Sequence, residues 1–227
     1  MSDAFRFSAV EIAALHDSAL ALWHENPDAA PDEFHPDGQS FLDTVLAQHR
    51  ANFDLWHVED RARTPGATDH DIAEVKRAID RINQRRNDLA EQCDSLLLEQ
   101  ATAILHPKGG SDSTAQPGVS GGPPLVAGVI PLHSESPGLM IDRLSILALK
   151  LYHTREEIAR PNAPAGHTER NRERMSLLEE QRSDLVACLD QLWSEVVAGT
   201  RRFKIYRQLK MYNDPTLNPS IYGSGST

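Results

Sequence analysis

The chain of 227 residues has few of the features that stabilise secreted or membrane proteins. It contains two cysteines, Cys93 and Cys188, and both fall on or beside apolar helical stripes. We therefore expect buried free thiols in a reducing cytoplasm and no disulfide framework. No apolar run approaches the ~20 residues that a membrane-spanning helix needs. Residues 7–23 are interrupted by Glu11 and Asp17, so we expect no signal peptide. These absences predict a cytoplasmic protein without a membrane span.

Strand patterns are nearly absent as well. Only residues 125–132 resemble an extended segment, and they lie within residues 107–138, which hold seven of the thirteen glycines and six of the fourteen prolines. Residues 107–135 are therefore expected to form a flexible or disordered internal loop. The length fits one domain, so we predict a single helical domain over residues 1–227.

Basic residues are scarce in the first 60 positions, where two stand against twelve acidic ones. The rest of the chain is balanced, with 21 residues of each sign, so the net charge of −10 comes from this N-terminal region. One basic cluster occurs late in the chain, at Arg201, Arg202, Lys204, Arg207 and Lys210. The acidic remainder argues against binding to duplex nucleic acid. The cluster fits either an anionic small ligand or a contact with the acidic N-terminal region.

Apolar residues recur at the three- and four-residue spacing of buried helix faces in six segments. The predicted helices cover residues 9–25, 40–63, 69–105 and 138–160, a long helix after Thr168 with a stripe from Met175 to Val196, and a last piece over residues 201–212. Ser136 and Thr168 are expected to cap the fourth and fifth of these helices. Long helices with heptad-like stripes and short turns are typical of bundles. We therefore predict an all-α fold, an antiparallel helical bundle of about five to six helices with a long Gly/Pro-rich loop.

The second predicted helix carries the most informative pattern. Its inward positions begin as core residues and then become polar on the same line. They read Leu42, Val45, His49, Asn52, Trp56, Glu59 and Arg63. Burying such polar groups costs several kcal/mol each unless they are paired. The stripe therefore predicts a polar pocket. The alternatives are a structural network, or an exposed Glu59–Arg63 pair beside a core Trp56.

The third predicted helix adds polar residues at the same kind of position. Arg86 interrupts its apolar stripe, and Asn83 and Asn87 flank it one turn apart. Asparagine is a poor helix former, so two of them in mid-helix suggest a role for their side chains. A solvated face explains the two asparagines equally well, whereas Arg86 favours a functional role.

The fourth predicted helix places Asp142 in its first turns, where the helix dipole favours an anion. Arg143 and Lys150 lie seven positions apart and could hold an anionic group together. Unpaired buried charges are too costly to scatter. We therefore expect four charged residues from three helices to lie close together, namely Glu59, Arg63, Arg86 and Asp142.

Four stretches of the chain resemble a known bacterial family. They are residues 52–63, 76–88, 136–150 and 206–215. Through these strings the chain resembles the family catalogued as domain of unknown function 4254, over about residues 40–105 and 136–219. The resemblance implies a cytoplasmic protein that is often encoded beside glycosyltransferase and surface-glycan genes. It implies no particular reaction, and residues 107–135 lie outside it.

Two classes of function fit these observations. In the first, the chain is an enzyme or a strict small-molecule binder for an anionic ligand, such as a sugar phosphate or nucleotide sugar in glycan or specialised metabolite assembly. The candidate acid–base groups are Glu59, Asp142, His57 and His49. The candidate ligand-binding residues are Asn52, Trp56, Arg63, Asn83, Arg86, Asn87, Arg143, Lys150, Arg207 and Lys210.

In the second class, the chain is a non-catalytic helical scaffold whose polar stripes set the register of packing, in a homodimer or with a helical protein partner. The sequence lacks a Walker motif, a GxGxxG motif and the Cys/His spacing of a zinc site. No cofactor is therefore predicted and no metal ligand is assigned. The one-turn spacing of His57 and Asp60 keeps a carboxylate- and histidine-based metal-dependent enzyme as a second alternative.

Overall fold

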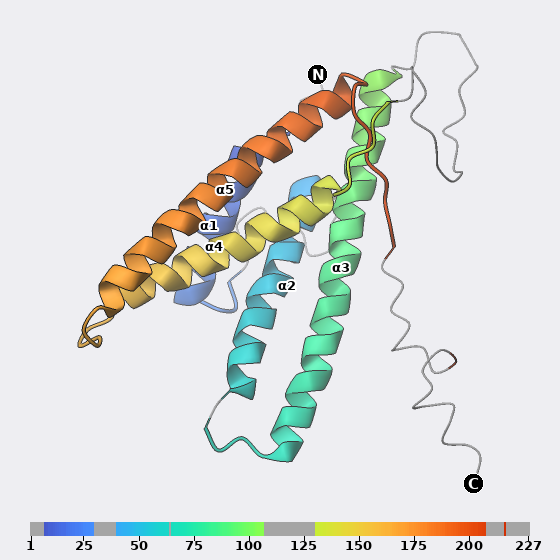
Figure 1. Cartoon of the computed structure of the whole chain (residues 1–227). Coiled ribbons are helices and arrows are strands. Elements are labelled where there is room, and N and C mark those ends of the chain that lie inside the picture. Colours follow the sequence, from blue (N-terminus) through green and yellow to red (C-terminus); the bar gives the residue numbers. More distant parts are fainter. Residues whose placement is uncertain (1–6, 30–39, 64, 107–129, 208–215, 217–227) are drawn as a thin grey trace.

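Figure 1 shows the computed structural model of the chain, which describes residues 7–29, 40–63, 65–106, 130–207 and 216. These residues form five helices that include more than half of the whole chain. The helices are α1 (Ala9–Glu25), α2 (Phe41–Ala62), α3 (Asp69–Leu105), α4 (Pro137–Ala159) and α5 (His167–Val197). In place of strands, the described residues contain one isolated parallel bridge between Leu132 and Arg202. The predicted all-α fold is confirmed.

Local capping sets where the first three helices begin. The Ser8 side chain accepts a hydrogen bond from the first turn of α1. Complete capping boxes open α2 and α3, formed by Ser40 with Asp43 and by Thr68 with Asp71. Each box satisfies backbone donors that the helix itself leaves without a partner. Because these signals are local in sequence, the three helices begin within one residue of the predicted positions.

Two helical pairs cross in the bundle. The helices α2 and α3 pack along each other as a hairpin, and α4 and α5 form the second pair (Figure 1). The first helix, α1, contacts α2, α4 and α5. Among the five described helices, only α4 contacts each of the other four. Its buried residues accordingly cover a wide face, while Leu139, Arg143 and Lys150 lie on its exposed side. It is the central element of the bundle.

The α2–α3 hairpin extends beyond the other helices at its closed end (Figure 1). The first buried residue of α3 is Ala90, and Ile72, which begins the predicted apolar stripe of this helix, is 46% exposed. In α2 burial ends at Val58, so the polar part of its stripe is the part that leaves the bundle. The expected inward position of Leu42 is wrong, since it is 49% exposed. The buried face there follows Val45, about 60° around the helix.

The start of α4 is held by a side chain of α3. The carboxylate of Asp94 accepts hydrogen bonds from the Gly138 backbone N–H (2.6 Å) and the Ser136 hydroxyl (2.5 Å). Ser136 is the N-cap residue of α4, as predicted, and Pro137 opens its first turn, but the Ser136 hydroxyl donates to Asp94 and makes no capping bond within the helix. Residue 138 must be glycine here, since a Cβ would overlap the carbonyl oxygen of Ala90. Burial raises the pKa of Asp94 to about 6.

The predicted last helix is wrong over its described part. Residues 201–207 are not helical and hold only the bridge residue Arg202, and residues 208–215 lie outside the described residues. The backbone N–H of Arg202 donates to the carbonyl oxygen of Pro131 (3.0 Å), and Phe203 is buried. Pairing with a distant segment and burial of one aromatic ring thus replace the helix. The guanidinium of Arg201 pairs with Glu195 of α5 (2.8 Å), which is not in the acidic N-terminal region.

The start of α5 also differs from the prediction. The helix begins at His167 with Gly166 at the N-cap position, so Thr168 is not its cap. The ring of His167 lies 2.9 Å from a carboxylate oxygen of Glu157, near the end of α4. This tertiary contact links the two helices at their turn, and a sequence pattern within α5 does not reveal it.

The predicted loop, the two cysteines and the expected lack of a membrane span can also be compared with the structure. Of the predicted loop, residues 107–129 lie outside the described residues. Cys93 is free and buried as expected, whereas Cys188 is free but exposed, because it stands one position off the buried stripe that contains Leu189. None of the described helices combines the length and apolar character that crossing a bilayer requires.

The contact between α3 and α4 can be tested by Gly138→Ala. We expect the free energy of unfolding to fall by about 1–3 kcal/mol, the usual cost of overpacking, because the new methyl group pushes α4 away from Ala90. The measurement is urea denaturation followed by far-UV circular dichroism. The exposed neighbour supplies the control Leu139→Ala, with an expected change of about 0.5 kcal/mol. An equal loss in both variants would contradict the close-approach argument.

Candidate functional site

A buried carboxylate joins three helices. The Asp142 side chain on α4 is 14% exposed, and its Oδ1 accepts hydrogen bonds from two amides of α2, those of Asn52 (3.0 Å) and Gln48. The Nε of Arg86 on α3 lies 3.7 Å from the same oxygen. Arg86 also donates to the amide oxygen of Asn52 (3.3 Å). Three of the predicted polar residues, Asn52 of α2, Arg86 of α3 and Asp142 of α4, therefore meet in one network.

Asn52 continues the network into the core. Its amide nitrogen also donates to the Ser145 hydroxyl oxygen (2.9 Å), which lies 2.6 Å from Nδ1 of His49. Nε2 of His49 lies 3.1 Å from the carbonyl oxygen of His16. A carbonyl oxygen can only accept, so Nε2 carries the proton and Nδ1 accepts from Ser145. His49 is held as a neutral imidazole with both nitrogens occupied.

Burial sets the charge states in this network. It raises the pKa of Asp142, against the opposing effects of Arg86 and of the amide donors. It lowers the pKa of His49 to about 3, and that of His16 well below the ordinary value. Both imidazoles are therefore neutral at pH 7. Arg86 and Asp142 form the one ion pair of the network.

A cavity of about 360 Å³ opens beside Arg86. Its polar lining comes from α2 and α3, and its apolar lining from α2 and α4. The lining residues are Asn52, Leu55, Trp56, Glu59, Asp60, Arg63, Arg86, Ile146 and Leu149. Arg63 stands at the rim, 69% exposed and paired with Glu59 (3.2 Å). Arg86 is held more firmly, since the network fixes its guanidinium while the side chain still reaches the cavity.

Two further cavities lie along α4. One of about 590 Å³ shares Trp56 and Asp60 with the first cavity and is also lined by Lys150. The other, of about 630 Å³, lies between α4 and α5 and is lined by both Arg143 and Lys150. The structure therefore brings this predicted pair to one cavity. The charge of Arg143 is already compensated there by Glu135, at 2.8 Å.

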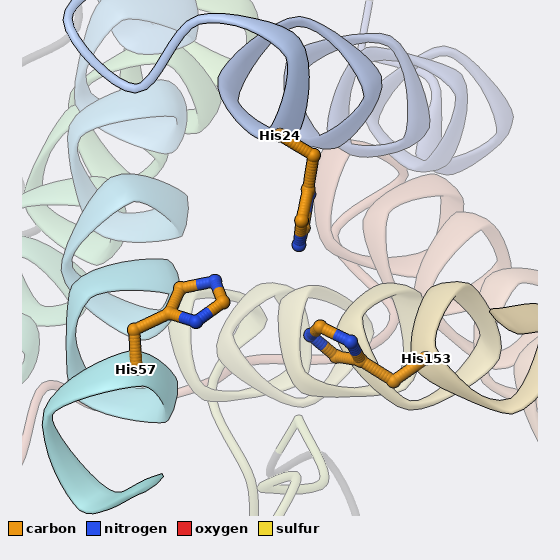
Figure 2. Close-up of side chains that lie close together, drawn as sticks. All are labelled: His24, His57 and His153. Carbon is orange, nitrogen blue, oxygen red and sulfur yellow. The ribbon is translucent and has the colours of Figure 1, made fainter. Parts of the chain in front are cut away.

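Three histidines gather near Trp56. His24 of α1, His57 of α2 and His153 of α4 direct their rings toward one another (Figure 2). Each offers a ring nitrogen that lies within 4.8 Å of a nitrogen of the other two. Burial lowers the pKa of His57, and the two neighbouring histidines lower it further. These residues have the chemistry of metal ligands.

The comparison with known families covers most of this arrangement. A family model described as "Protein of unknown function (DUF4254)" matches residues 42–205. The chain belongs to this family. All the side chains of the Asp142 network lie within the part that matches the DUF4254 model. His16 on α1, whose backbone carbonyl oxygen accepts from His49, lies outside it. No curated protein and no solved structure matches the chain.

The four predicted acid–base candidates lie in three environments. His49 is fully buried, and the network occupies both its nitrogens. Asp142 is the centre of that network, and Glu59 lines the cavity while paired with Arg63. His57 belongs to the histidine group. The structure thus places no two of these candidates in hydrogen-bond contact within the described residues.

The predicted ligand-binding residues divide more simply. Four of them line the cavity beside Arg86, namely Asn52, Trp56, Arg63 and Arg86 itself. Asn83 and Asn87 are half-buried but line none of the three cavities along α4. Arg207 is exposed and also outside these cavities, and Lys210 lies outside the described residues.

Sequence reasoning missed several polar residues of the site. Gln48 is fully buried and donates to Asp142, although it lies one position off the predicted stripe. His24 and His153 each stand beside apolar residues of their own helices, with no spacing motif that links them. The sequence carries one weak sign of this histidine group, because on three helices a histidine directly follows an aromatic residue. These pairs are Trp23-His24, Trp56-His57 and Tyr152-His153.

The network can be tested by removing its central acceptor. Asp142→Ala leaves the donors of Gln48, Asn52 and Arg86 without their shared oxygen, so we expect a loss of about 3–5 kcal/mol in the free energy of unfolding. Asp142→Asn keeps one carbonyl oxygen and should lose less. Urea denaturation gives both values. The exposed control Asp88→Ala should change stability by about 0.5 kcal/mol or less, and a similar loss in all three variants would contradict the network.

His16 generates a pH prediction. Its ring is fully buried, and neither ring nitrogen has a hydrogen-bond partner. Folding lowers the pKa of His16. Below pH 6.5 the unfolded chain therefore takes up a proton that the folded chain does not. As a result, the free energy of unfolding falls as the pH falls. The variant His16→Leu removes this loss. Its stability advantage over the wild type should grow as pH falls from 7 to 5, by up to about 1.4 kcal/mol per pH unit.

Denaturant unfolding at several pH values checks this expectation. The control is His70→Leu at an exposed position of α3. That variant should run parallel to the wild type, and a parallel curve for His16→Leu would contradict the argument.

Proposed function

We propose that this protein binds an anionic small molecule in the cavity beside Arg86. The ligand class that fits best is a phosphorylated or nucleotide-linked sugar, used in the cytoplasm in glycan or specialised metabolite assembly. Support for an anion comes from a cation that the fold itself positions. The Arg86 side chain is 22% exposed and lines the cavity, and the hydrogen bond to Asn52 holds its guanidinium there.

Pre-organisation is the physical reason why Arg86 suits this role. A guanidinium presents five donors in a planar fork that matches carboxylate and phosphate oxygens. Asn52 and Asp142 use only part of this fork, and they restrict the side chain to one position. Binding to a restrained arginine costs less conformational entropy than binding to a flexible surface side chain, which the ligand must first order.

The walls of the cavity support a ligand with both polar and apolar parts. Trp56, Leu55 and Leu149 supply apolar surface, while Asn52 and Glu59 supply hydrogen-bonding groups. A volume of about 360 Å³ is within the range of small-molecule sites. The adjoining cavity that shares Trp56 and Asp60 gives a longer ligand room to extend. Sugar phosphates and nucleotide sugars combine these properties.

A non-catalytic scaffold remains the second candidate, and the network itself supports it. The donors that act on Asp142 all come from the protein, and they link α2, α3 and α4. Such a buried polar network can set the register of packed helices without any ligand. In that case a homodimer or a helical protein partner would use a surface of the bundle.

Ligand binding separates the two candidates. Inorganic pyrophosphate, glucose 1-phosphate and UDP-glucose serve as probes in thermal-shift and calorimetric titrations. A probe at about 100 times its Kd should stabilise the wild type by about 2.7 kcal/mol. Arg86→Gln should weaken binding at least about tenfold, because a charge-assisted hydrogen bond is lost. The exposed neighbour supplies the matched control Arg85→Gln, with expected binding like that of the wild type.

The double variant Arg86→Gln with Asp142→Asn guards against a trivial loss of folding. It removes both charges of the pair, so no buried carboxylate is left without its partner. It should also fail to bind the probe while it retains its helical content. Equal affinity in the wild type and both Arg86 variants, or no stabilisation of the wild type by any probe, would reject the proposal.

A further inference from the structure

The three histidines near Trp56 form a group that the proposed anion site does not use. They come from three helices that are far apart in the sequence, with His24 near the end of α1, His57 in the last part of α2 and His153 in the last part of α4 (Figure 2). The distances between ring centroids are 5.2 to 5.7 Å, and the rings stand at 67° to 79° to one another. This arrangement brings ring edges, where the nitrogens lie, toward a common space.

One nitrogen of each ring is buried without a partner. Nε2 of His24, of His57 and of His153 has no hydrogen-bond partner in the described structure and almost no contact with solvent. A buried polar atom without a partner costs about 1–3 kcal/mol. Three such atoms in one place are a considerable cost, and apolar side chains would fill the same space without it.

Hydrogen bonds at the opposite nitrogens determine which atoms carry protons. Nδ1 of His24 lies 2.8 Å from the carbonyl oxygen of Leu20, and Nδ1 of His153 lies 2.7 Å from a carboxylate oxygen of Glu156. Both partners accept, so each Nδ1 carries a proton, and in the neutral ring the free lone pair is on Nε2. Metal-binding histidines show this pattern, in which a carbonyl or carboxylate orients the ring through its other nitrogen.

Aromatic side chains enclose the group. Tyr152 stacks on His24 at 4.0 Å between centroids, Trp56 stacks on His153 at 4.8 Å, and Phe53 lies 4.5 Å from His57. These contacts limit the rotation of the three rings. An apolar shell of this kind also restricts water and strengthens the binding of an ion to its ligands.

We propose that His24, His57 and His153 bind one divalent transition-metal ion of the Zn²⁺ type through their Nε2 atoms. Imidazole nitrogen suits zinc and its neighbours, whereas Mg²⁺ and Ca²⁺ prefer oxygen ligands. With three protein ligands, a fourth position is left for water or a small molecule, as in catalytic zinc sites. Metal–nitrogen bonds of about 2.0–2.1 Å require nitrogens about 3.4 Å apart in a tetrahedral site, so small side-chain rotations close the present spacing of up to 4.8 Å.

The position of this site brings it next to the space of the proposed ligand. His153 lines the cavity of about 590 Å³ together with Trp56 and Asp60, which also line the cavity beside Arg86. An ion held by these histidines would lie next to the space assigned to an anionic ligand. The sequence assigned no metal ligands because the three histidines share no spacing motif.

Zinc titration of the metal-free full chain tests the proposal. The protein is stripped with a chelator, any polyhistidine tag is removed, and Zn²⁺ is added in competition with a chromophoric chelator. We expect one equivalent to bind. Single variants His24→Ala, His57→Ala and His153→Ala should each weaken binding at least about 100-fold, the upper end of the effect of a supporting residue. Glu156→Gln, which alters only the orienting partner of His153, should weaken it about tenfold.

Matched controls keep the result specific. His70→Ala removes an exposed histidine of α3 and should bind zinc like the wild type. Co²⁺ added in place of Zn²⁺ should give the visible absorption of tetrahedral nitrogen coordination in the wild type, and His153→Asn, a smaller polar replacement that favours folding, should lose it. No zinc binding by the wild type, or equal affinity in the wild type and the three alanine variants, would overturn the proposal.

The metal site and the anion site can fail separately. Arg86→Gln should retain full zinc affinity, because Arg86 lies in the other cavity lining and contacts none of the three histidines in the described structure. Conversely, loss of zinc in His24→Ala leaves the pyrophosphate titration of the metal-free protein unchanged. Circular dichroism of the same samples checks that each variant is folded, and loss of both zinc and pyrophosphate binding in a folded His24→Ala variant would overturn the separation of the two sites.

Discussion

The carboxylate of Asp142 can be buried only because two other helices supply its donors. Removing a carboxylate from water costs several kcal/mol unless charge and hydrogen bonds compensate it. Gln48 and Asn52 of α2 and Arg86 of α3 do so at one oxygen atom. This requirement restricts how α2 and α3 can lie against α4, the one helix among the five described that contacts all the others. The crossing of the two helical pairs and the cavity beside Arg86 both depend on it.

The central part of α2 connects the two polar regions of the molecule. Its Asn52 face meets the Asp142 network and the cavity, and its His57 face meets α1 and the histidine group. Trp56 lies between them, lining the cavity on one side and stacking on His153 on the other. A ligand in the cavity and an ion at the histidines would therefore share one rigid aromatic wall. This arrangement makes metal-assisted chemistry on an anionic ligand a coherent combination of the two proposals.

Much of the fold follows from local signals, and the errors occur where distant contacts prevail. The capping boxes at Ser40 and Thr68 place α2 and α3 correctly, because all the interacting atoms lie within one turn. The segment after α5 has a helical pattern but its described residues are not helical, since Arg202 forms a bridge with Leu132, 70 positions earlier in the chain. Ser136 has the residue type of a cap, yet its hydroxyl serves Asp94 of another helix.

The sequence by itself determined the helices α1 to α4 to within a residue or two, and it determined that α2 turns from apolar to polar along its inward stripe. Those properties depend on neighbours in the chain and on helical periodicity. Only the tertiary structure decided that Arg86 and Asp142 meet, that His49 is locked behind them, and that His24, His57 and His153 form one group. The crossing angles of separate helices set these meetings, and no spacing within a single helix encodes them.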